Sequence, residues 1–500
     1  MIIEVFLTLS SLLLLWIMVT RRKHGLPPGP MPFPIIGNLP QLALSGAKRP
    51  YTAFHNLAKK HGDIMTLRMG SADVVVLSSY EVMRDVLGKE EWSGRIFEES
   101  LKARYLNQRL GILFLEGEAY KDQRRFLLRH LKDLGFGKKD AMESMISVEL
   151  QELTSRLRQR MADGKQAVVC MHNYFNLSVL NVLWTMIAGT RYSHDDEKLL
   201  TLIEHVDMLM KCGSVGNLSS MFPILRKIAP KLTGEEKQLE AYRVLQNFLR
   251  ELIQERKQIQ GKEEDSNPEN CFLDIYLQEI NKFQGDSSSL YTEDQLVMLC
   301  FDMLLAGSET TSNSLCFAIL YMMLYPQVQD KVYKELVDVV GRTSHISLEN
   351  RNKLPYTQAV LMEVLRISNV SPAAIPHTIM GRDAIYRDYK IPKDTIVMIN
   401  LYSVHMNKEH WTDPEVFRPE RFLDSGNMLN KDEHLIPFGV GKRICLGESL
   451  AQSSLFLYFT TLIMNFKFET VPGHLNPSDE PVLGFTLSPM PYNAVVSCRS

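Results

Sequence analysis

One apolar segment of about 30 residues limits the fold of this chain more than any other feature. It starts at the capping-box pattern Thr292–Gln295 (TEDQ), and its helical periodicity runs to a stop at Pro326. A helix of this length must cross most of a domain, so other helices have to pack around it. With 500 residues, the chain is also long enough to bury a large core.

The middle of this segment, Ala306–Thr311 (AGSETT), is polar where its surroundings are apolar. A buried carboxylate or hydroxyl is costly unless it finds a partner. The pattern therefore favours a polar pocket or a functional distortion of the helix. An internal cap or a glycine required for packing is the alternative.

Most of the remaining periodicity is helical too. Helices are predicted for residues 51–60, 119–130, 141–161, 171–187 and 235–258. Strands are predicted for residues 64–68, 73–77 and 395–399. The first two strands would form a small sheet that could meet the third, and the polar stretch 260–270 is typical of a solvated loop.

The N-terminus predicts a membrane anchor at residues 1–20. From Ile2 to Val19, 14 of 18 residues are apolar, and the basic run Arg21–His24 follows. A cleaved signal peptide, the rival interpretation, would need basic residues before the apolar run and a small-residue cleavage site after it. Within residues 21–38, the proline-rich run 27–34 predicts a stiff extended spacer, with a flexible linker as the alternative.

Residues 39–500 are expected to form one globular body with ordinary composition. The counts of 56 basic and 58 acidic residues give a net charge of −2, and 45% of the chain is hydrophobic. This balance disfavours both disorder and nucleic-acid binding. The seven cysteines are too irregularly spaced for a disulfide framework, which favours a reducing compartment.

The strongest motif is Phe438–Gly447 (FGVGKRICLG), in which glycines surround Cys445. Gly439 and Gly441 permit an unusual loop, and Gly447 leaves room for something flat to approach the backbone. Amides at the start of the next helix could stabilise a thiolate. A buried structural cysteine is the alternative, whereas a phosphate-binding loop lacks its required pattern.

Two charged motifs accompany this loop. Glu363 and Arg366 (EVLR) lie three residues apart, as in ordinary solvated pairs on a helix surface. Pro419–Phe422 (PERF) adds Arg421, so that a buried network of three charges becomes an option.

Taken together, these motifs resemble the cytochrome P-450 family of haem-thiolate monooxygenases. The cysteine loop fits the family pattern FxxGxRxCxG at every fixed position, and EVLR, PERF and AGSETT follow the family's order. The chain is similar to microsomal members of the clan that holds vertebrate drug- and fatty-acid-oxidising enzymes. Its long helix resembles arthropod members, some of which are similar to juvenile-hormone-pathway epoxidases. The resemblance implies a mainly α fold with a small β-rich subdomain and an N-terminal transmembrane helix.

The resemblance also implies roles for individual residues. Cys445 would be the thiolate ligand of the iron in haem b. Glu309 and Thr310 would form an acid–alcohol pair that organises water and delivers protons during dioxygen activation. Ala306 and Gly307 would leave room for oxygen at a kink. The remaining implied roles are haem packing by Phe438 and a structural triad of Glu363, Arg366 and Arg421.

Haem propionates need cations, and the resemblance implies Arg124, Arg443 and His377 as their partners. Where the family usually has Trp, four residues before Arg124, this chain has Tyr120. Arg95 stands where some relatives place a further propionate contact, with an ordinary surface arginine as the alternative.

The segment 119–140 carries seven basic and three acidic residues, a local excess of +4. A solvated helix face would explain this excess. The resemblance instead implies that this helix is the docking face for an NADPH-dependent reductase, which cytochrome b5 supplements in some members of the family. The chain contains no flavin or nicotinamide fingerprint, so its electrons must come from a partner.

The sequence therefore predicts an endoplasmic-reticulum monooxygenase that hydroxylates or epoxidises a lipophilic molecule: an isoprenoid such as a juvenile-hormone precursor, a fatty acid, a steroid or a xenobiotic. From the family layout, the pocket walls are expected at residues 101–114, 370–375 and 484–487 and at Ala306. A haem-thiolate isomerase or dehydratase that needs no reductase is an alternative, although such enzymes tend to lose the acid–alcohol pair. A non-catalytic, membrane-tethered haem or lipid carrier is another.

Overall fold

The computed structural model describes residues 25–499, apart from positions 47–48, 71, 162–164, 213–230, 232, 261–270 and 343–344. The predicted anchor at residues 1–20 and almost all of the predicted loop 260–270 lie outside the described residues. Among the residues that are described, no helix has both the length and the apolar character needed to cross a membrane.

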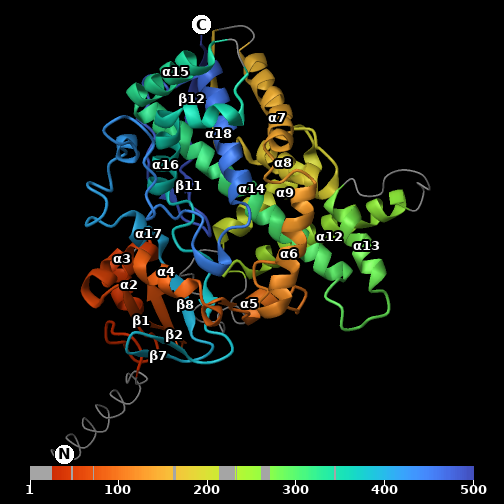
Figure 1. The fold of residues 1–500 in the computed structure, drawn as a ribbon, viewed down its shortest axis with the longest axis vertical. Helices are drawn as coiled ribbons and strands as arrows, with labels where there is room; N and C mark the ends of the chain where they lie inside the picture. The colour runs from red at the N-terminus through yellow and green to blue at the C-terminus, as the bar shows by residue number, and fades with distance from the viewer. Residues whose placement is uncertain are drawn as a thin grey trace, which may run out of the picture.

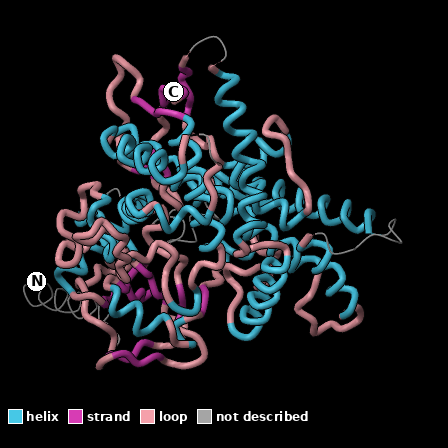
Figure 2. The backbone as a smooth tube through the Cα atoms, turned by 45° about the horizontal axis from the view of Figure 1, so that its top comes forward, coloured by secondary structure: helices cyan, strands magenta, loops and turns pink. Residues whose placement is uncertain are grey.

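The described chain is mainly helical, with its strands gathered in small sheets (Figures 1 and 2). The helices are α2 (Leu39–Gly46), α3 (Pro50–His61), α4 (Tyr80–Leu87), α5 (Glu99–Lys102), α6 (Gly117–Asp133), α7 (Lys139–Arg160), α8 (Asn176–Ala188), α9 (Glu197–Cys212), α12 (Glu235–Gln260), α13 (Phe272–Lys282), α14 (Glu293–Leu324), α15 (Pro326–Val340), α16 (Pro355–Ser368), α17 (Leu401–His405) and α18 (Glu448–Asn465). Short 3-10 turns are η1 (Glu90–Trp92), η2 (Leu348–Lys353), η3 (Pro419–Phe422) and η4 (Gly441–Arg443).

The largest sheet has the strand order β1-β2-β8-β5-β3. Its antiparallel hairpin of β1 (Ile64–Met69) and β2 (Ala72–Leu77) pairs in parallel with β8 (Ile396–Ile399), which confirms the predicted meeting of early and late strands. The other strands are β3 (Gly94–Arg95), β4 (Gln166–Cys170), β5 (His377–Thr378), β6 (Ala384–Tyr386), β7 (Tyr389–Ile391), β9 (Phe466–Glu469), β10 (Pro481–Val482), β11 (Ser488–Pro489) and β12 (Asn493–Cys498). A second sheet, of order β4-β12-β9, lies near the C-terminus.

The predicted helices are all present among the described residues, with one late start. The helix predicted from Met171 begins at Asn176, because β4 occupies the chain up to Cys170 and a turn with Asn173 at a positive φ of 54° follows. Sequence periodicity marks the apolar face of this helix but cannot tell the turn from the first helical residues.

The long helix α14 has the bounds that the sequence predicts. Thr292 Oγ1 accepts a hydrogen bond from the Gln295 N–H at 3.1 Å, so one half of the predicted capping box forms. The Gln295 side chain does not complete it, because its amide turns inward and pairs with the backbone N–H and C=O of Gly111, each at 2.9 Å. The helix ends at Leu324, and Pro326 opens α15 directly.

Helix α14 belongs to two apolar cores at once. Residues 296–305 pack with α6, α8, α9, α12 and α13, whereas residues 315–323 pack with α7, α15 and α18. The polar segment 306–312 lies between these two blocks. The polar interruption in the sequence is therefore the border between two cores.

Residues 26–32 of the proline-rich segment form neither helix nor strand, and the segment lies against the sheet. The Thr66 N–H donates to the Pro28 carbonyl oxygen at 2.8 Å, and Asn38 Nδ2 donates to that of Pro30 at 3.1 Å. Backbone carbonyls that proline leaves without helical partners are thereby used to dock this segment on β1.

Candidate active site

A cavity of about 320 Å³ separates the middle of α14 from the cysteine loop. Ala306 and Thr310 line it from α14, and Phe438 and Cys445 line it from the cysteine loop. Most of the remaining lining is apolar. The predicted walls at residues 101–114, 370–375 and 484–487 each contribute lining residues.

The cysteine loop is closed by a hydrogen bond from the Cys445 N–H to the Phe438 carbonyl oxygen at 2.9 Å. Gly439 and Gly441 have φ angles of 76° and 84°, which other residues rarely adopt. A Cβ atom at Gly441 would also lie 2.2 Å from the Leu87 carbonyl oxygen of α4. The loop therefore needs glycine at this position both for its conformation and for its close approach to α4.

The Cys445 side chain is exposed, but only to the cavity, since the residue lies deep in the protein. Burial raises the pKa of its thiol, and hydrogen bonding from the Gly447 backbone N–H opposes that rise without cancelling it. The amides that the sequence predicts at the start of α18 are thus in place, but by themselves they do not make Cys445 a thiolate. Gly447 also lines the cavity.

Helix α14 remains one helix from Glu293 to Leu324 and does not unwind at the polar segment to satisfy its hydroxyls. The hydroxyls find partners one turn back instead: Ser308 Oγ donates to the Leu304 carbonyl oxygen, and Thr310 Oγ1 to that of Ala306, both at 2.8 Å. Thr310 nevertheless faces the cavity, where its oxygen can accept a hydrogen bond.

Glu309 does not line this cavity, and only 3% of the residue is exposed. Its Oε1 accepts from Asn313 Nδ2 at a long 3.4 Å, and its Oε2 has no hydrogen-bond partner. Burial, together with the Asp207 charge, raises the pKa of Glu309 to about 8. The carboxyl group therefore holds its proton at neutral pH, one residue from Thr310.

Gly307 is a packing glycine, the alternative that the sequence left open. A Cβ at this position would lie 2.4 Å from Leu183 Cδ2 of α8, so the missing side chain allows two helices to approach. Gly307 still lines the cavity, but the exposed cavity surface at this level belongs to Ala306.

One edge of the cavity carries a cluster of cations. Arg95, Arg124 and Arg443 line it together with His377. Arg443 donates from Nε to the Ser93 carbonyl oxygen at 2.8 Å, and its buried Nη1 has no partner. Burial and the nearby Arg443 charge lower the pKa of Arg95, and burial and the Arg95 charge lower that of His377. Because these cations repel one another, the cluster fits a ligand with negative groups at this edge.

Tyr120 stands at the position where the family usually has Trp, and it contacts the other residues of this edge. Its hydroxyl donates to the Lys442 carbonyl oxygen at 3.3 Å and accepts from Arg124 Nη1 at 3.1 Å. The Arg443 guanidinium stacks on its ring, 3.4 Å from the centroid. Arg95, which sequence left open as a surface arginine, is only 6% exposed. In the sequence, only the position of Arg95 in the family pattern indicated a role for it at this site.

The predicted charge triad is buried. Arg366 forms two 2.8 Å hydrogen bonds with the carboxylate of Glu363, and Arg421 Nε donates to the same carboxylate at 3.0 Å. Arg366 also donates to the carbonyl oxygens of His405 and Pro414, at 2.8 Å each. The interpretation of EVLR as a solvated surface pair is therefore wrong. The network ties α16 to the chain that leads into the cysteine loop.

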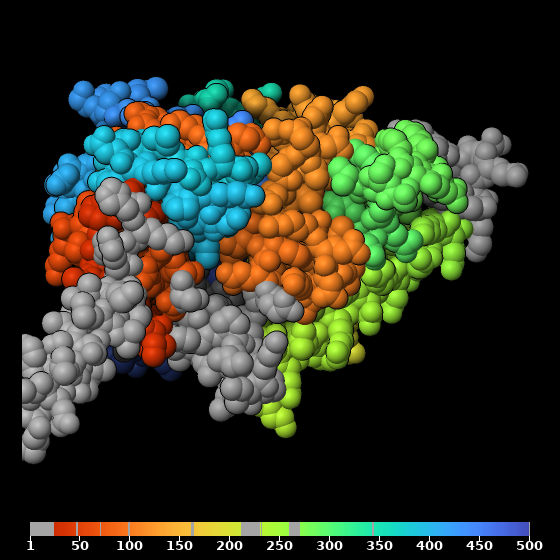
Figure 3. Space-filling model, turned by 90° about the horizontal axis from the view of Figure 1, so that it is seen from below, coloured from red at the N-terminus to blue at the C-terminus, as the bar shows by residue number. Residues whose placement is uncertain are grey.

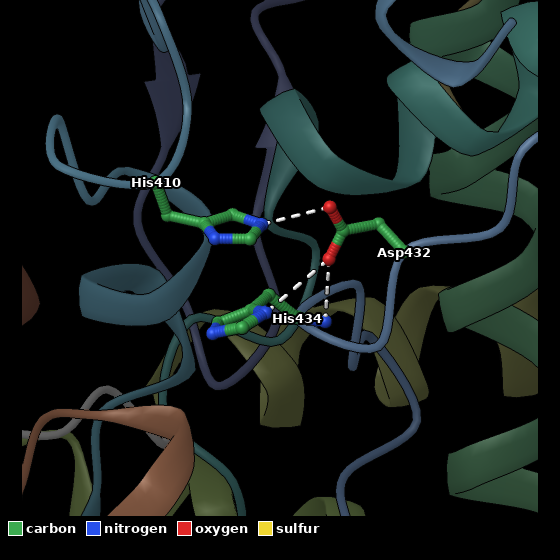
Figure 4. A group of neighbouring side chains, drawn as sticks. All are labelled: His410, Asp432 and His434. Carbon is green, nitrogen blue, oxygen red and sulfur yellow. Dashed lines mark hydrogen bonds and ion pairs between the residues drawn. The ribbon is translucent and has the colours of Figure 1, made fainter. Parts of the chain in front are cut away.

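Another group of possible metal ligands lies in the chain segment before the cysteine loop (Figure 4). It consists of His410, Asp432 and His434. One Asp432 oxygen lies 2.8 Å from His410 Nε2, and the other accepts from the His434 backbone N–H at 2.8 Å. The two imidazoles stack with centroids 3.7 Å apart. Because the carboxylate oxygens are engaged and stacked rings cannot both aim lone pairs at one ion, this group is better described as a bridge between loops.

A comparison with protein-family models matches residues 27–496 to the model described as Cytochrome P450. The chain belongs to the cytochrome P450 family. It is thus a haem-dependent monooxygenase that takes its electrons from a reductase. The site fits that cofactor: Cys445 and Thr310 line the same cavity, and so do the cations that would bind the two propionates.

Named relatives cover nearly the whole chain. Farnesoate epoxidase of Bombyx mori is 35% identical over 494 residues, which are 97% of each chain. Cytochrome P450 2J1 of Oryctolagus cuniculus is 32% identical, over 95% of this chain and 91% of its own length. Probable cytochrome P450 303a1 of Drosophila melanogaster is also 32% identical, over 96% and 95% of the two chains.

Proposed function

We propose that Cys445 is the haem-iron ligand and that Glu309 and Thr310 supply protons to a reaction in the cavity above it. The observation that carries this proposal is a single cavity that is lined by Cys445 of the cysteine loop and by Thr310 of α14. Haem with a thiolate ligand activates dioxygen, so that one oxygen atom enters the substrate and the other is reduced to water.

Proton supply is a task for this chain's own residues. Glu309 is protonated at neutral pH because burial raises its pKa to about 8, and it lies beside Thr310 in sequence. Thr310 Oγ1 faces the cavity and can pass a proton from a water molecule to a reacting oxygen. Since Glu309 does not face the cavity, rotation of its side chain or a chain of water must link the two groups.

The residues around the haem would hold it and exclude water. Arg95, Arg124, Arg443 and His377 would bind the propionates, while Phe438 packs beside Cys445. The buried triad of Glu363, Arg366 and Arg421 would keep the cysteine loop in position, because loss of one partner in such a network costs about 3–5 kcal/mol.

Helix α6 is proposed as the docking face for the reductase and for cytochrome b5. The exposed cations on α6 and its continuation are Arg125, Arg129, Lys132, Lys138 and Lys139. The chain around α6, in orange, forms an open part of the surface in Figure 3. Arg124 on the same helix donates to the Ile444 carbonyl oxygen at 3.0 Å, so this face lies next to the cysteine loop. An acidic electron donor would therefore approach the haem from its thiolate side.

We also place the protein in the endoplasmic-reticulum membrane, with residues 1–20 as the anchor, residues 21–38 as the hinge and the catalytic domain on the cytoplasmic side. The basic run Arg21–His24 supports this orientation, and NADPH supplies the electrons through the reductase. The apolar cavity favours lipophilic substrates, and the similarity to a farnesoate epoxidase favours isoprenoids among the candidate classes.

The test is oxygenation of a lipophilic substrate by purified protein with reductase and NADPH. Wild-type protein should show the Soret shift of a thiolate-ligated haem when it is reduced under carbon monoxide, and Cys445→Ser should lose both the shift and the product. Thr310→Ala should release peroxide at the expense of product. A Cys445→Ser protein with full activity would contradict the ligand assignment, and unchanged coupling in Thr310→Ala would remove the proton role.

A further inference from the structure

Arg104 is a buried cation that none of the proposed roles uses. It lies in the turn after α5 and lines the cavity together with Asp302 and Met303 of α14. Its side chain is 16% exposed, and its backbone carbonyl accepts from Gln246 Nε2 of α12 at 2.9 Å. This hydrogen bond fixes the backbone from which the Arg104 side chain extends to the cavity wall.

The surroundings of Arg104 use only part of its hydrogen-bonding capacity, through the side chain of Tyr105. The nearest carboxylate oxygen, Asp302 Oδ1, is 3.9 Å from Nη2, which is too far for a hydrogen bond. Both Asp302 oxygens are already occupied, because Tyr105 donates to one and the backbone N–H groups of Ile112 and Leu113 donate to the other. The buried Nε of Arg104 has no partner at all.

Aromatic rings account for part of the stability of this cation. The Arg104 guanidinium lies 5.2 Å from the ring centroid of Tyr105, 5.7 Å from that of Phe114 and 5.3 Å from that of Phe301. Such contacts stabilise a cation but supply no hydrogen-bond acceptor in the ring plane of the guanidinium. An oxygen atom on a ligand in the cavity would supply that acceptor.

We propose that Arg104 binds the carboxylate or ester carbonyl oxygen at one end of an elongated apolar substrate. This inference rests on the proposed function and narrows its substrate class. Asp302, beside Arg104, precedes Thr310 by eight residues, which is about 12 Å along the axis of α14. The bound oxygen therefore lies far from the reacting site, and oxygenation takes place near the opposite end of the molecule.

The test compares three ligands that share one carbon skeleton: farnesoic acid, its methyl ester and the hydrocarbon farnesene. Equilibrium dialysis gives the affinity of each for the wild-type holoprotein and for Arg104→Leu, Arg104→Lys and Arg109→Leu. Arg109 is the matched control, because it belongs to the same loop, bonds to the Arg95 and Phe114 carbonyl oxygens and does not line the cavity.

In Arg104→Leu the acid should bind about 10- to 100-fold more weakly, the loss expected for a hydrogen bond to a charged group, while farnesene binding stays unchanged. Arg104→Lys should restore most of the affinity for the acid, and Arg109→Leu should behave as wild type. A loss for the acid alone identifies an ionised carboxylate as the bound group, and an equal loss for acid and ester identifies a carbonyl oxygen.

Equal losses for all three ligands, or none, would overturn the assignment. The ratio of acid to farnesene affinity within each variant does not depend on how much protein is folded. The proposed function has a separate readout: if the affinities change as stated but reductase and NADPH give no oxygenated product, the monooxygenase proposal fails and the binding role of Arg104 stands.

Discussion

Helix α14 carries two buried carboxyl groups, Asp302 and Glu309, two turns apart, and their surroundings differ sharply. Asp302 accepts three hydrogen bonds and lies beside the Arg104 charge. Glu309 has one long hydrogen bond, and its second oxygen has none. Burial raises the pKa of both groups. At Asp302 the Arg104 charge and two backbone N–H groups oppose this rise, and at Glu309 the Asn313 side chain and the Lys211 charge do.

This difference suggests separate roles: the carboxyl group of Asp302 stabilises the fold, and that of Glu309 is available for proton transfer. Asp302 fastens the loop that contains Ile112 and Leu113 to the long helix, and so shapes the cavity wall. Glu309 gains almost nothing from its surroundings, and a buried group without partners is costly unless it has a function. Variants at both positions can test whether this division of roles is correct.

The largest effect is expected for Asp302→Ala. Removal of the carboxylate leaves three buried donors unsatisfied, so the free energy of unfolding should fall by about 3–5 kcal/mol. Asp302→Asn keeps one acceptor oxygen and should lose less. Urea unfolding measures both, with Glu309→Ala as the control. The comparison fails if Glu309→Ala destabilises the protein as much as Asp302→Ala does.

Glu309→Gln should act on chemistry instead. The amide cannot release a proton, so the fraction of NADPH electrons that appears in product should fall about tenfold or more, with peroxide rising in its place. Substrate affinity should not change, because Glu309 does not line the cavity. Product and peroxide are measured per NADPH consumed. Unaltered coupling would mean that Glu309 is a structural residue like Asp302.

The pH dependence of stability gives a third effect, which is small over any single pH unit. Above the ordinary pKa of 4.5, the unfolded chain loses the Glu309 proton, whereas the folded protein keeps it up to a pKa of about 8. The folded state then binds more protons, so its stability falls as the pH rises through this window, by at most about 1.4 kcal/mol per unit. Glu309→Gln should flatten this slope in urea unfolding. A parallel slope in both proteins would contradict the assigned pKa.

Asn313→Ala should produce the smallest change. The Asn313 amide donates the one hydrogen bond to Glu309, which lowers the carboxyl pKa. Its loss should move the upper end of the pH window to a slightly higher pH, by less than one unit given the 3.4 Å length. The same unfolding experiments detect the shift, and a movement toward lower pH would show that Asn313 does not act on Glu309.

The sequence predicted the elements of this fold better than the directions of its side chains. Apolar periodicity and caps gave the bounds of α14 and marked β1, β2 and β8 as strands, because these patterns are local. No local pattern shows that Glu309 does not line the cavity or that Gly307 packs on Leu183, since both depend on where α8 lies.

The same limit applies to the arginines. Arg443 was identified because it belongs to a motif, and its place at the cavity edge agrees with that prediction. Arg104 was missed, although the segment around it was expected to form a pocket wall. A lone arginine in a polar turn has the appearance of a solvated residue, and only the fold brings it beside Asp302 and Phe301.

The position of α14 between two cores has a consequence for local opening. Its ends are each locked into an apolar block, but residues 306–312 border the cavity, and their hydroxyls compete for backbone carbonyls. Amide hydrogen exchange should therefore be faster in this segment than in the flanking turns, without unfolding of either block. Local opening of α14 is therefore expected to be easiest at residues 306–312, the part of the helix that borders the cavity.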